Sequence, residues 1–276
     1  MKKSHNIKVF AKGAVIGGSM LLPGLSGGTL AILLGIYDKL IKSVSDITKR
    51  IDIKRNLLFL CIFSLGGLIG AISFSHILSS VLSLWGFYLS FLFMGAVIGT
   101  VPVIYKQSGA DRLSLKDVLS TAIGVMLSVS INLIPENVMN ISDINSFSEF
   151  LLLFIAGIFI AIALILPGIS VSYTLLILGI YQRVIDAVKN LDILYILPIA
   201  FGCVVGILGF TRLLDYLMTK FTRSVYMIIS GFVISCIPRI FPGLPTGVGY
   251  LIAIPLLIVG FWVVYSVAGK AQKNFV

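Results

Sequence analysis

The chain has 276 residues, of which 58% are apolar and 12% are charged, and its formal net charge is +10. This composition excludes an ordinary soluble domain and is typical of integral membrane proteins. The positive charge does not require a nucleic-acid partner, because Lys and Arg also gather on the cytoplasmic side of membrane proteins, where they meet anionic lipids. We therefore expect membrane lipids, and no nucleic acid, as partners.

The apolar residues form segments that are separated by polar stretches. The first segment follows a basic start but runs straight into a Pro-Gly break without a small-residue cleavage site, so it does not resemble a signal peptide. We expect one all-α membrane domain over residues 1–276. Its apolar segments are 9–37, 57–82, 86–105, 115–134, 149–181, 193–218, 224–241 and 248–268.

The most informative feature is a duplicated motif. The stretch L-P-G-L-S-G-G-T…G-I-Y at 22–37 returns as L-P-G-I-S-V-S-Y…G-I-Y at 166–181, and nine of twenty positions are identical between 22–41 and 166–185. Further matches continue at an offset of 136, for example Gly95 with Gly231. Fixed-offset similarity indicates an internal repeat. We expect a first repeat over 1–134, a linker over 135–148 and a second repeat over 149–276.

The topology depends on the first segment of each repeat. Residues 149–181 are too few for two full spans of about 20 residues each, so this segment is either one broken span or a re-entrant hairpin. With two re-entrant hairpins, 18 of the 21 Lys and Arg residues share one side; with two single crossings the split is roughly 9 to 12. The positive-inside rule favours re-entrant hairpins and cytoplasmic termini. Each repeat then has a re-entrant helical hairpin and three transmembrane helices, an odd number, so the repeats are inverted.

The two Pro-Gly motifs predict an anion-binding site. In each hairpin the second half-helix begins just after Pro-Gly, with Ser26 or Ser170 as its N-cap, and its free N–H groups would point toward mid-membrane. Gly27 and Gly28 would let a ligand approach the backbone. Two facing helix N-termini suit phosphate or carboxylate, whereas the alternative is that these residues only cap short helices. The further hydroxyl donors are Thr29, Ser172, Tyr173 and Thr174.

Few charged or titratable side chains lie within the apolar segments, where they are costly and often functional. His76 and Arg212 occupy equivalent positions in the two repeats. Arg212 could pair with a lipid phosphate or with Asp215, or its guanidinium could snorkel to the interface. Arg239 could anchor the outer edge or gate an anionic headgroup, and His76 could be structural or a proton relay. All three are candidate substrate-binding residues.

The positions of the acidic residues and the cysteines restrict which enzyme or carrier classes the chain could belong to. No apolar segment has a pair of carboxylates in its middle, which counts against a metal-assisted or carboxylate-based enzyme and against a sodium-coupled carrier. The three cysteines, Cys61, Cys203 and Cys236, lie in apolar segments without metal or redox spacing and are expected to be packing residues. We expect no enzymatic activity, cofactor or metal, and any coupling ion is left open.

The chain resembles the polyprenyl-phosphate transporter (PopT) family. The specific signature is P-G-x-S-G-G-T…G-I-Y at 23–37, and the resemblance covers essentially the whole chain through the eight segments and the second P-G-I-S at 167–170. It implies a flippase in the bacterial plasma membrane that returns undecaprenyl phosphate to the cytoplasmic leaflet for reuse. Val171 and Ser172 depart from the Gly-Ser of the family pattern, which implies a looser contact with ligand at the second tip.

Two alternatives belong to other functional classes. An integral-membrane undecaprenyl-diphosphate phosphatase also has inverted re-entrant repeats and a P-G-x-S motif. In that enzyme class an arginine follows the serine and glutamates cluster nearby, whereas Gly27 and Val171 follow the serines here. The other alternative is a carrier of a small soluble anion. Phosphate release from a lipid diphosphate would identify the enzyme, and a lateral opening would distinguish lipid from soluble cargo.

Overall fold

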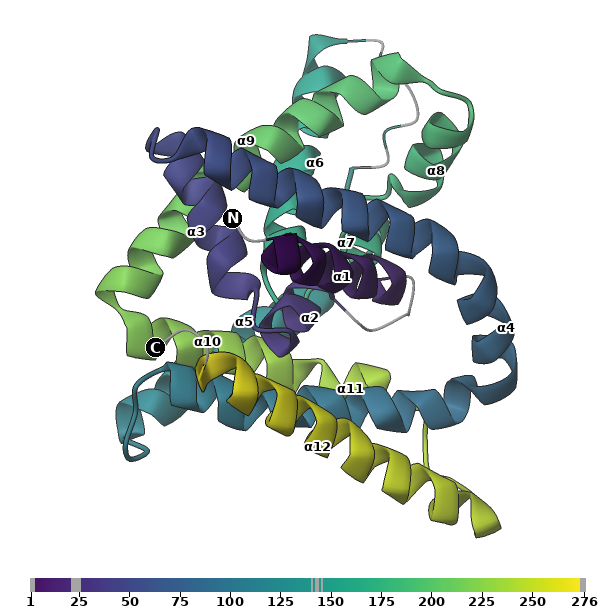
Figure 1. Ribbon diagram of the computed structural model, residues 1–276. Helices are drawn as coiled ribbons and strands as arrows, with labels where there is room; N and C mark the ends of the chain where they lie inside the picture. Colours follow the sequence, from purple (N-terminus) through teal and green to yellow (C-terminus); the bar gives the residue numbers. More distant parts are fainter. Residues whose placement is uncertain (1–2, 21–25, 140, 142–143, 145, 274–276) are drawn as a thin grey trace.

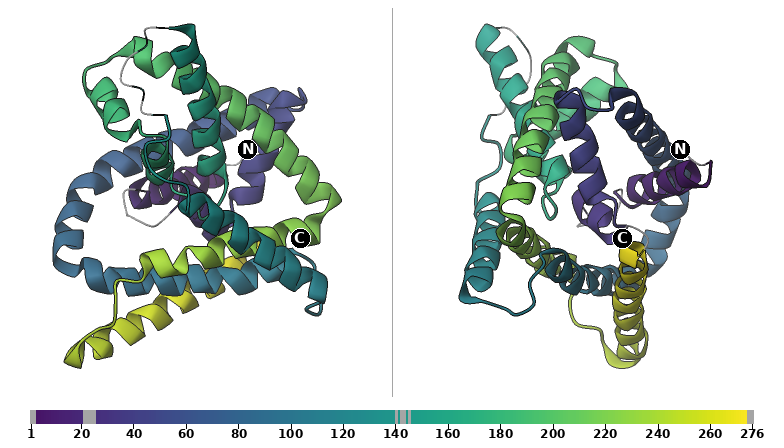
Figure 2. Two further views of the ribbon diagram at one scale, coloured as in Figure 1. Left: turned by 180° about the vertical axis from the view of Figure 1, so that it is seen from behind. Right: turned by 60° about the vertical axis from the view of Figure 1, so that its left-hand side comes forward.

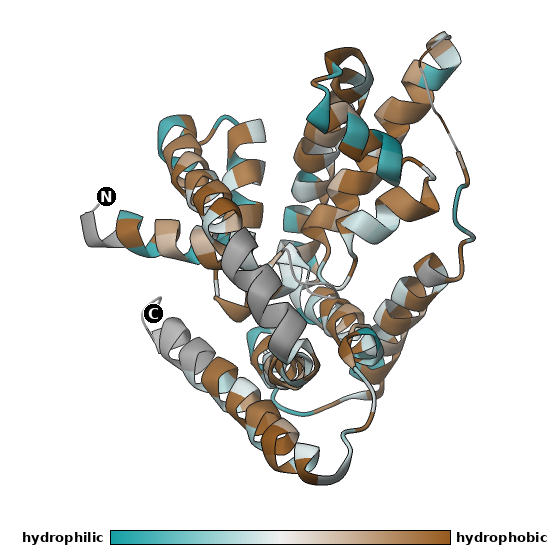
Figure 3. Cartoon of the chain, turned by 90° about the vertical axis from the view of Figure 1, so that its right-hand side faces the viewer, coloured by the Kyte–Doolittle hydropathy of each residue, from teal (hydrophilic) through white to brown (hydrophobic). Residues whose placement is uncertain are grey.

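The computed structural model describes the backbone of residues 3–20, 26–139, 141, 144 and 146–273, and side-chain surroundings except at 3–5, 75–84, 132 and 267–273. Within these residues the regular structure is helical, without strands (Figure 1). Most of the length of the long helices is hydrophobic, as the brown colouring in Figure 3 shows. In the part of the chain that the structure describes, six segments are long and apolar enough to cross a membrane, which confirms an all-α multi-pass membrane protein. They are Ile53–Phe74, Trp85–Gln107, Phe147–Ile165, Ile193–Lys220, Thr222–Ile240 and Gly247–Ser266.

The first half of the chain contains α1 (Lys3–Ser19), α2 (Gly27–Leu33), α3 (Tyr37–Thr48), α4 (Ile53–Gln107) and α5 (Leu115–Asn132). Helix α4 joins the two expected segments 57–82 and 86–105 into one helix of 55 residues. Residues 75–85 contain no Pro or Gly that would break it. Instead α4 curves back on itself, so that its two halves run on opposite sides of α1 and α2 (Figures 1 and 2).

The second half contains α6 (Phe147–Ile165), α7 (Val171–Ile177), α8 (Tyr181–Lys189), α9 (Ile193–Lys220), α10 (Thr222–Ser235), α11 (Ile237–Ile240), the 3₁₀ turn η1 (Gly247–Gly249) and α12 (Tyr250–Lys273). Helices α7 and α8 meet at an angle of 114°. The expected segment 149–181 is therefore divided among α6, α7 and the turn before α8.

The G-I-Y end of each motif forms the same turn. Gly35 has a φ of +60° and Gly179 a φ of +72°, a conformation that glycine adopts at little cost. The N–H groups of Gly35 and Ile36 donate to the carbonyl oxygens of Ile32 and Ala31, and the second motif repeats this pattern. These bonds satisfy carbonyls at the end of each short helix and redirect the chain into the next helix.

The charged stretches that follow the two motifs are helical rather than loops. Both α3 and α8 are amphipathic, and α3 buries Tyr37, Ile41 and Ser45. Segment-averaged hydropathy does not detect such helices because their polar and apolar residues alternate at helical spacing. The linker is also ordered where it is described: the N–H of Val138 donates to the carbonyl of Ile177 at 2.9 Å, at the end of α7.

Glycines permit close helix crossings, and these recur at matched positions. A Cβ at Gly95 would lie 1.9 Å from the carbonyl oxygen of Leu257, and one at Gly260 would lie 2.0 Å from that of Leu92, so α4 and α12 pack backbone to backbone. The equivalent crossing of α10 with α5 depends on Gly231 and Gly124. Equivalent contacts join α1 to α4 and α6 to α9, at Gly13, Gly66, Gly157 and Gly202. Small residues allow such approach in apolar surroundings.

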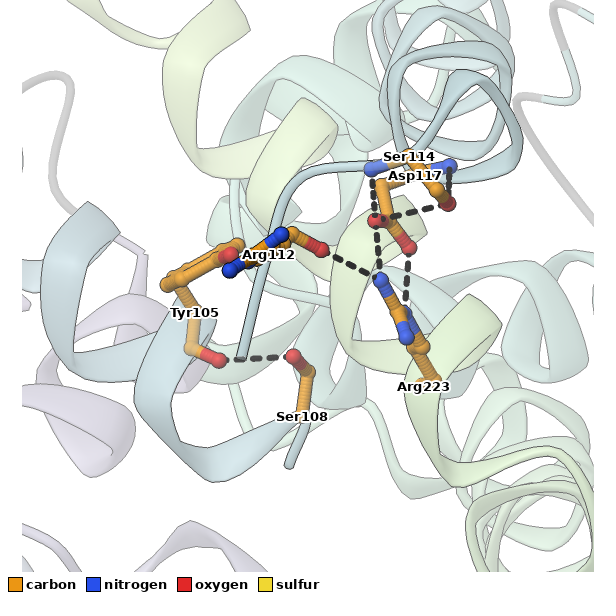
Figure 4. Close-up of polar contacts among 6 residues, drawn as sticks. All are labelled: Tyr105, Ser108, Arg112, Ser114, Asp117 and Arg223. Atoms are coloured by element: carbon orange, nitrogen blue, oxygen red, sulfur yellow. Dashed lines mark hydrogen bonds and ion pairs between the residues drawn. The ribbon is translucent and has the colours of Figure 1, made fainter. Parts of the chain in front are cut away.

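An ion pair joins α5 to α10 (Figure 4). The guanidinium of Arg223 donates to both carboxylate oxygens of Asp117, at 2.7 and 2.6 Å, and to the carbonyl oxygen of Arg112 at 2.7 Å. Asp117 also accepts from the backbone N–H of Ser114, completing a capping box at the start of α5. This bidentate contact fixes the ends of the two helices to one another.

Candidate functional site

The serine of each repeated motif caps the short helix that follows Pro-Gly, as the sequence predicts. Ser26 accepts a hydrogen bond from the N–H of Thr29 at 3.2 Å, at the start of α2. Ser170 accepts from the N–H of Tyr173 at 3.5 Å, at the start of α7. Each helix has only seven residues, so its dipole is weaker than that of a full helix and the hydroxyl groups contribute more of the local polarity.

The two motifs touch each other directly. The N–H of Gly168 donates to the hydroxyl oxygen of Ser26 at 3.0 Å and to that of Thr29 at 3.2 Å, across more than 130 residues of sequence. Gly168 has a φ of +88°, and a Cβ there would lie 2.4 Å from the carbonyl oxygen of Phe232. A Cβ at Gly28 would lie 2.8 Å from the carbonyl oxygen of Ile165. Gly28 therefore lets the two tips meet, and Gly168 lets the second tip pack against α10.

A cavity of about 540 Å³ lies where the tips meet. Among the described residues that line it, Arg239 is the one that carries a charge. The Arg239 guanidinium carbon lies 5.4 Å from the ring centroid of Tyr173, within the range of a cation–π interaction. This contact joins two side chains that both line the cavity. The lining residues are Ser26, Ser90, Gly168, Ser170, Tyr173, Cys236, Arg239, Ile240, Phe241 and Pro242.

This combination of groups suits an oxyanion. A guanidinium presents several N–H donors in a planar fork that matches two phosphate oxygens, and hydroxyl groups of Ser and Tyr can donate to further oxygens. Hydrogen bonds to a charged partner are roughly twice as strong as neutral ones. Ile240 and Phe241 add apolar surface to the lining, and Arg239 is exposed, so an anion can reach its guanidinium.

The structure gathers some of the predicted site residues and separates others. Ser26, Ser170, Tyr173 and Arg239 line the cavity. Thr29 is buried behind it, and Thr174 is buried with its hydroxyl donating to the carbonyl of Ser170 at 3.0 Å. The remaining predicted residues lie elsewhere: Gly27 and Gly28 line a second cavity on the other side of the tip, and Ser172 is exposed.

Arg212, the charged candidate from the middle of the second repeat, does not line the cavity. Arg212 is exposed on α9 and is not among the lining residues. Asp215 interacts with α3 in place of the suggested pairing with Arg212: it accepts from the ammonium of Lys49 at 2.6 Å and from the hydroxyl of Ser45 at 2.7 Å. Ser45 lies on α3 and Lys49 caps the end of that helix. The average hydropathy of the sequence does not reveal α3 because the helix is amphipathic. His76 lies within 75–84, outside the residues whose side chains are described.

Several residues at or near the cavity could not be identified as site residues from the sequence. Ser90 and Pro242 line the cavity although neither belongs to a motif. Cys236, expected to be a packing residue, is 3% exposed and also lines the cavity.

Lys12 contacts the end of the first short helix. The ammonium of Lys12 donates to the carbonyl oxygen of Leu34 at 2.6 Å, at the end of α2. A cation there complements the negative end of the helix.

Arg183, on α8, forms an ion pair with Asp192, which lies just before α9. Its guanidinium carbon lies 4.3 Å from the centroid of the Tyr195 ring. Hydrogen bonds from Arg183 and from the N–H of Tyr195 hold the pKa of Asp192 below its usual value. Asp192 also caps α9. These contacts fix α8 against α9, so they support the second motif without lining the cavity.

The fold and the cavity define a class: a multi-pass helical membrane protein with two contacting helix-break motifs. A family model described as undecaprenyl phosphate translocase-like matches residues 17–248. The chain belongs to this family, which confirms the resemblance seen in the sequence.

Two relatives cover most of the chain. It is 32% identical over 273 residues to a polyprenyl-phosphate transporter of Staphylococcus aureus, in a match that covers 95% of this chain and 96% of the relative. It is 27% identical over 258 residues to a polyprenyl-phosphate transporter of Vibrio cholerae, covering 87% of this chain and 79% of the relative. No solved structure gives a significant match to the chain.

Proposed function

We propose that this protein is a flippase that returns undecaprenyl phosphate from the outer to the cytoplasmic leaflet of the bacterial plasma membrane. The observation that carries the proposal is the cavity in which Ser26 and Ser170, one from each motif, share a wall with Arg239. The two relatives are polyprenyl-phosphate transporters by name, and a lipid with one phosphate and an apolar tail suits a polar cavity inside an apolar protein.

The chemistry of the cavity supports phosphate as the headgroup it binds. A phosphate that enters the membrane loses its hydration shell, which costs far more than a neutral group unless a fixed charge and hydrogen-bond donors replace the water. Arg239 supplies the charge and a planar fork of donors, and Ser26, Ser170 and Tyr173 supply hydroxyl groups. The phosphate would sit near mid-membrane at the two tips.

We further propose that two inverted-topology units, each a re-entrant hairpin and three spans, build the transporter. The matched glycine crossings support this, because α4 packs on α12 in the way that α10 packs on α5. The charge split supports cytoplasmic termini. In that topology Arg239 and the adjoining Phe241 lie toward the outer side, so the cavity opens outward.

Three lining residues have buried counterparts in the opposite repeat. The positions equivalent to Ser90, Cys236 and Ile240, at an offset of 136, are Tyr226, Thr100 and Ile104. Their side chains are 8%, 1% and 0% exposed. Because Cys236 and Ile240 are themselves only 3% and 6% exposed, the outward-facing state rests on the position of the cavity in the proposed topology. The inward-facing state would exchange the two sides.

A leaflet assay tests this function. Surface-exposed undecaprenyl phosphate is measured with a headgroup-binding probe in cells that contain or lack the protein, after other transporters of this lipid are removed. We expect more exposed lipid in cells without the protein. Equal exposure would refute the flippase. Purified protein is also incubated with undecaprenyl diphosphate, and release of inorganic phosphate would establish a diphosphatase instead.

A further inference from the structure

Helix α3 joins the two halves of the chain. It begins directly after the first G-I-Y turn and lies inside the curve of α4 (Figures 1 and 2). It packs against α4 of its own repeat and also against α9 of the second repeat. Its apolar face, with Tyr37 and Ile41, is buried between these helices. A short amphipathic helix is thus held in the interior by contacts to both repeats.

Both ends of α3 form polar contacts with the second repeat. Near its C-terminal end, Asp215 on α9 accepts from the hydroxyl of Ser45 at 2.7 Å and from the ammonium of Lys49 at 2.6 Å. The Asp215 side chain is 13% exposed and that of Lys49 is 36% exposed. At the N-terminal end, the carboxylate of Asp38 accepts a hydrogen bond from the hydroxyl of Tyr226 on α10. These contacts fix α3 on the second repeat.

Helix α8, which follows the second G-I-Y turn, is placed differently. It packs against α9 and α7, both of its own repeat, and lies outside the curve of α4 (Figures 1 and 2). Gln182 is equivalent to Asp38 at an offset of 144, and it donates to Asp186 on α8 itself at 3.3 Å. Ser90 is equivalent to Tyr226 at an offset of 136, and its hydroxyl donates within α4 at 3.0 Å. Two positions that are joined beside α3 are therefore bonded within their own helices on the other side.

This difference between α3 and α8 parallels the difference in exposure of the two sides. Ser90 and Arg239 line the polar cavity, and Arg239 is exposed. Their equivalents, Tyr226 and Val103, are 8% and 7% exposed. In the proposed topology α8 and the polar cavity lie toward the outer side and α3 lies toward the cytoplasm. An exchange between inverted units would release α3 from the second repeat and bring α8 onto the first.

We infer that α3 is the cytoplasmic gate of the transporter and that Asp215 holds this gate shut in the outward-facing state. The inference rests on the proposed function, because a gate is needed only if the cavity opens to the two sides in turn. The position equivalent to Asp215 in the first repeat is Ser79, so the outer side lacks this acid. A charge-assisted contact that forms in only one of two states shifts the equilibrium toward that state.

Thiol labelling in a background without the native cysteines tests the inference. Val103→Cys reports on the cytoplasmic side in inside-out vesicles, and Phe241→Cys reports on the outer side in whole cells, each with a membrane-impermeant reagent. Asp215→Asn removes the ion pair with Lys49, so the first labelling rate should rise and the second should fall. The ratio of the two rates should rise about tenfold, the effect of losing roughly one hydrogen bond to a charged group.

Further variants separate a gate from a structural contact. Lys49→Gln breaks the same pair at its more exposed partner and should raise the ratio as well, so the test does not depend on the folding of one variant. The exchange of Lys49→Asp with Asp215→Lys restores opposite charges and should bring the ratio back toward wild type. The matched control is Asp46→Asn, the same change at another acid of α3, which should keep the wild-type ratio.

Two results would overturn the inference. One is an unchanged ratio in Asp215→Asn or in Lys49→Gln. The other is faster labelling of Val103→Cys without slower labelling of Phe241→Cys, because a loosened α3 exposes the inner side without closing the outer one. Failure of the proposed function gives a different result, in which the leaflet assay does not distinguish cells that contain the wild-type protein from cells that lack it, whatever the labelling ratio.

Discussion

Arg239 supplies the charge in the polar cavity, and its removal should therefore weaken handling of the lipid phosphate. Hydrogen bonds to charged groups contribute about 1.5–3 kcal/mol, so we expect Arg239→Ala to lower transport about tenfold or more. Arg239→Lys should restore part of it, because an ammonium lacks the planar fork. Transport is measured by the leaflet assay, normalised to the amount of protein in the membrane.

Arg212→Ala is the matched control for this change. Arg212 is exposed on α9, away from the cavity, so its removal should leave transport close to wild type. The sequence alone favours the opposite order, because it places Arg212 deeper in its apolar segment. A larger loss of transport for Arg212→Ala than for Arg239→Ala would place the anion site on α9 instead.

The two serines act together at the tips. Replacing both Ser26 and Ser170 with Ala removes two N-caps, each of which contributes about 0.5–2 kcal/mol, and two hydroxyl groups that line the cavity. The N–H of Gly168 would keep its bond to Thr29 at 3.2 Å. We expect insertion into the membrane to continue and transport to fall. Normal transport by the double variant would mean that the serines serve the fold alone.

Gly168 is the residue at which a small change should cost most. Alanine would place a Cβ 2.4 Å from the carbonyl oxygen of Phe232, at a φ of +88°, and a strained conformation of this kind costs on the order of 1–3 kcal/mol. Gly168→Ala should lower the melting temperature in detergent. At Gly209, where a Cβ would meet nothing within 4 Å, alanine should leave that temperature unchanged or raise it. A similar melting temperature for both variants would contradict the close packing of the second tip against α10.

At the scale of elements, helix ends are held by specific contacts rather than by apolar packing alone. Arg223 joins α10 to the start of α5 through Asp117, a residue that is 2% exposed (Figure 4). Replacing Arg223 with Gln should leave Asp117 without its bidentate partner and lower the melting temperature by several degrees. Because the polar cavity is built from other residues, farnesyl phosphate binding below that temperature should persist. A loss of binding without a change in melting temperature would assign Arg223 to the site.

At the scale of the whole molecule, the proposed topology puts α3 and α8 on opposite sides of the membrane. Lys42 on α3 and Lys189 on α8 are both exposed. In a background without the native cysteines, Lys42→Cys should react with a membrane-impermeant thiol reagent only from the cytoplasmic side, and Lys189→Cys only from outside. Reaction of both from the same side would rule out inverted units.

The outward-facing state has its own signature. Phe241 lines the polar cavity and is 42% exposed, whereas Thr100, on the proposed cytoplasmic side, is 1% exposed. A cysteine at Phe241 should react from outside with the same reagent, and a cysteine at Thr100 should be protected from both sides in this state. A faster reaction at Thr100 than at Phe241 would show that the resting protein opens to the cytoplasm.

The sequence by itself determined the class of protein and the motifs that matter. Composition required a membrane, the repeated P-G-x-S and G-I-Y patterns marked the tips, and Ser26 and Ser170 were identifiable as caps because capping depends on local sequence. The amphipathic helices α3 and α8 and the continuity of α4 were missed, because average hydropathy does not resolve helical periodicity and no residue marks a gentle bend.

Only the tertiary structure decided which distant residues share a site. The contact of Gly168 with Ser26, the arrival of Arg239 rather than Arg212 at the cavity, and the pairing of Asp215 with Lys49 all join residues far apart in the chain. Such contacts depend on how helices cross, and the crossings depend on where small residues permit two backbones to approach. No single segment carries that information, because a helix face becomes a wall of a cavity only when another helix is packed against it.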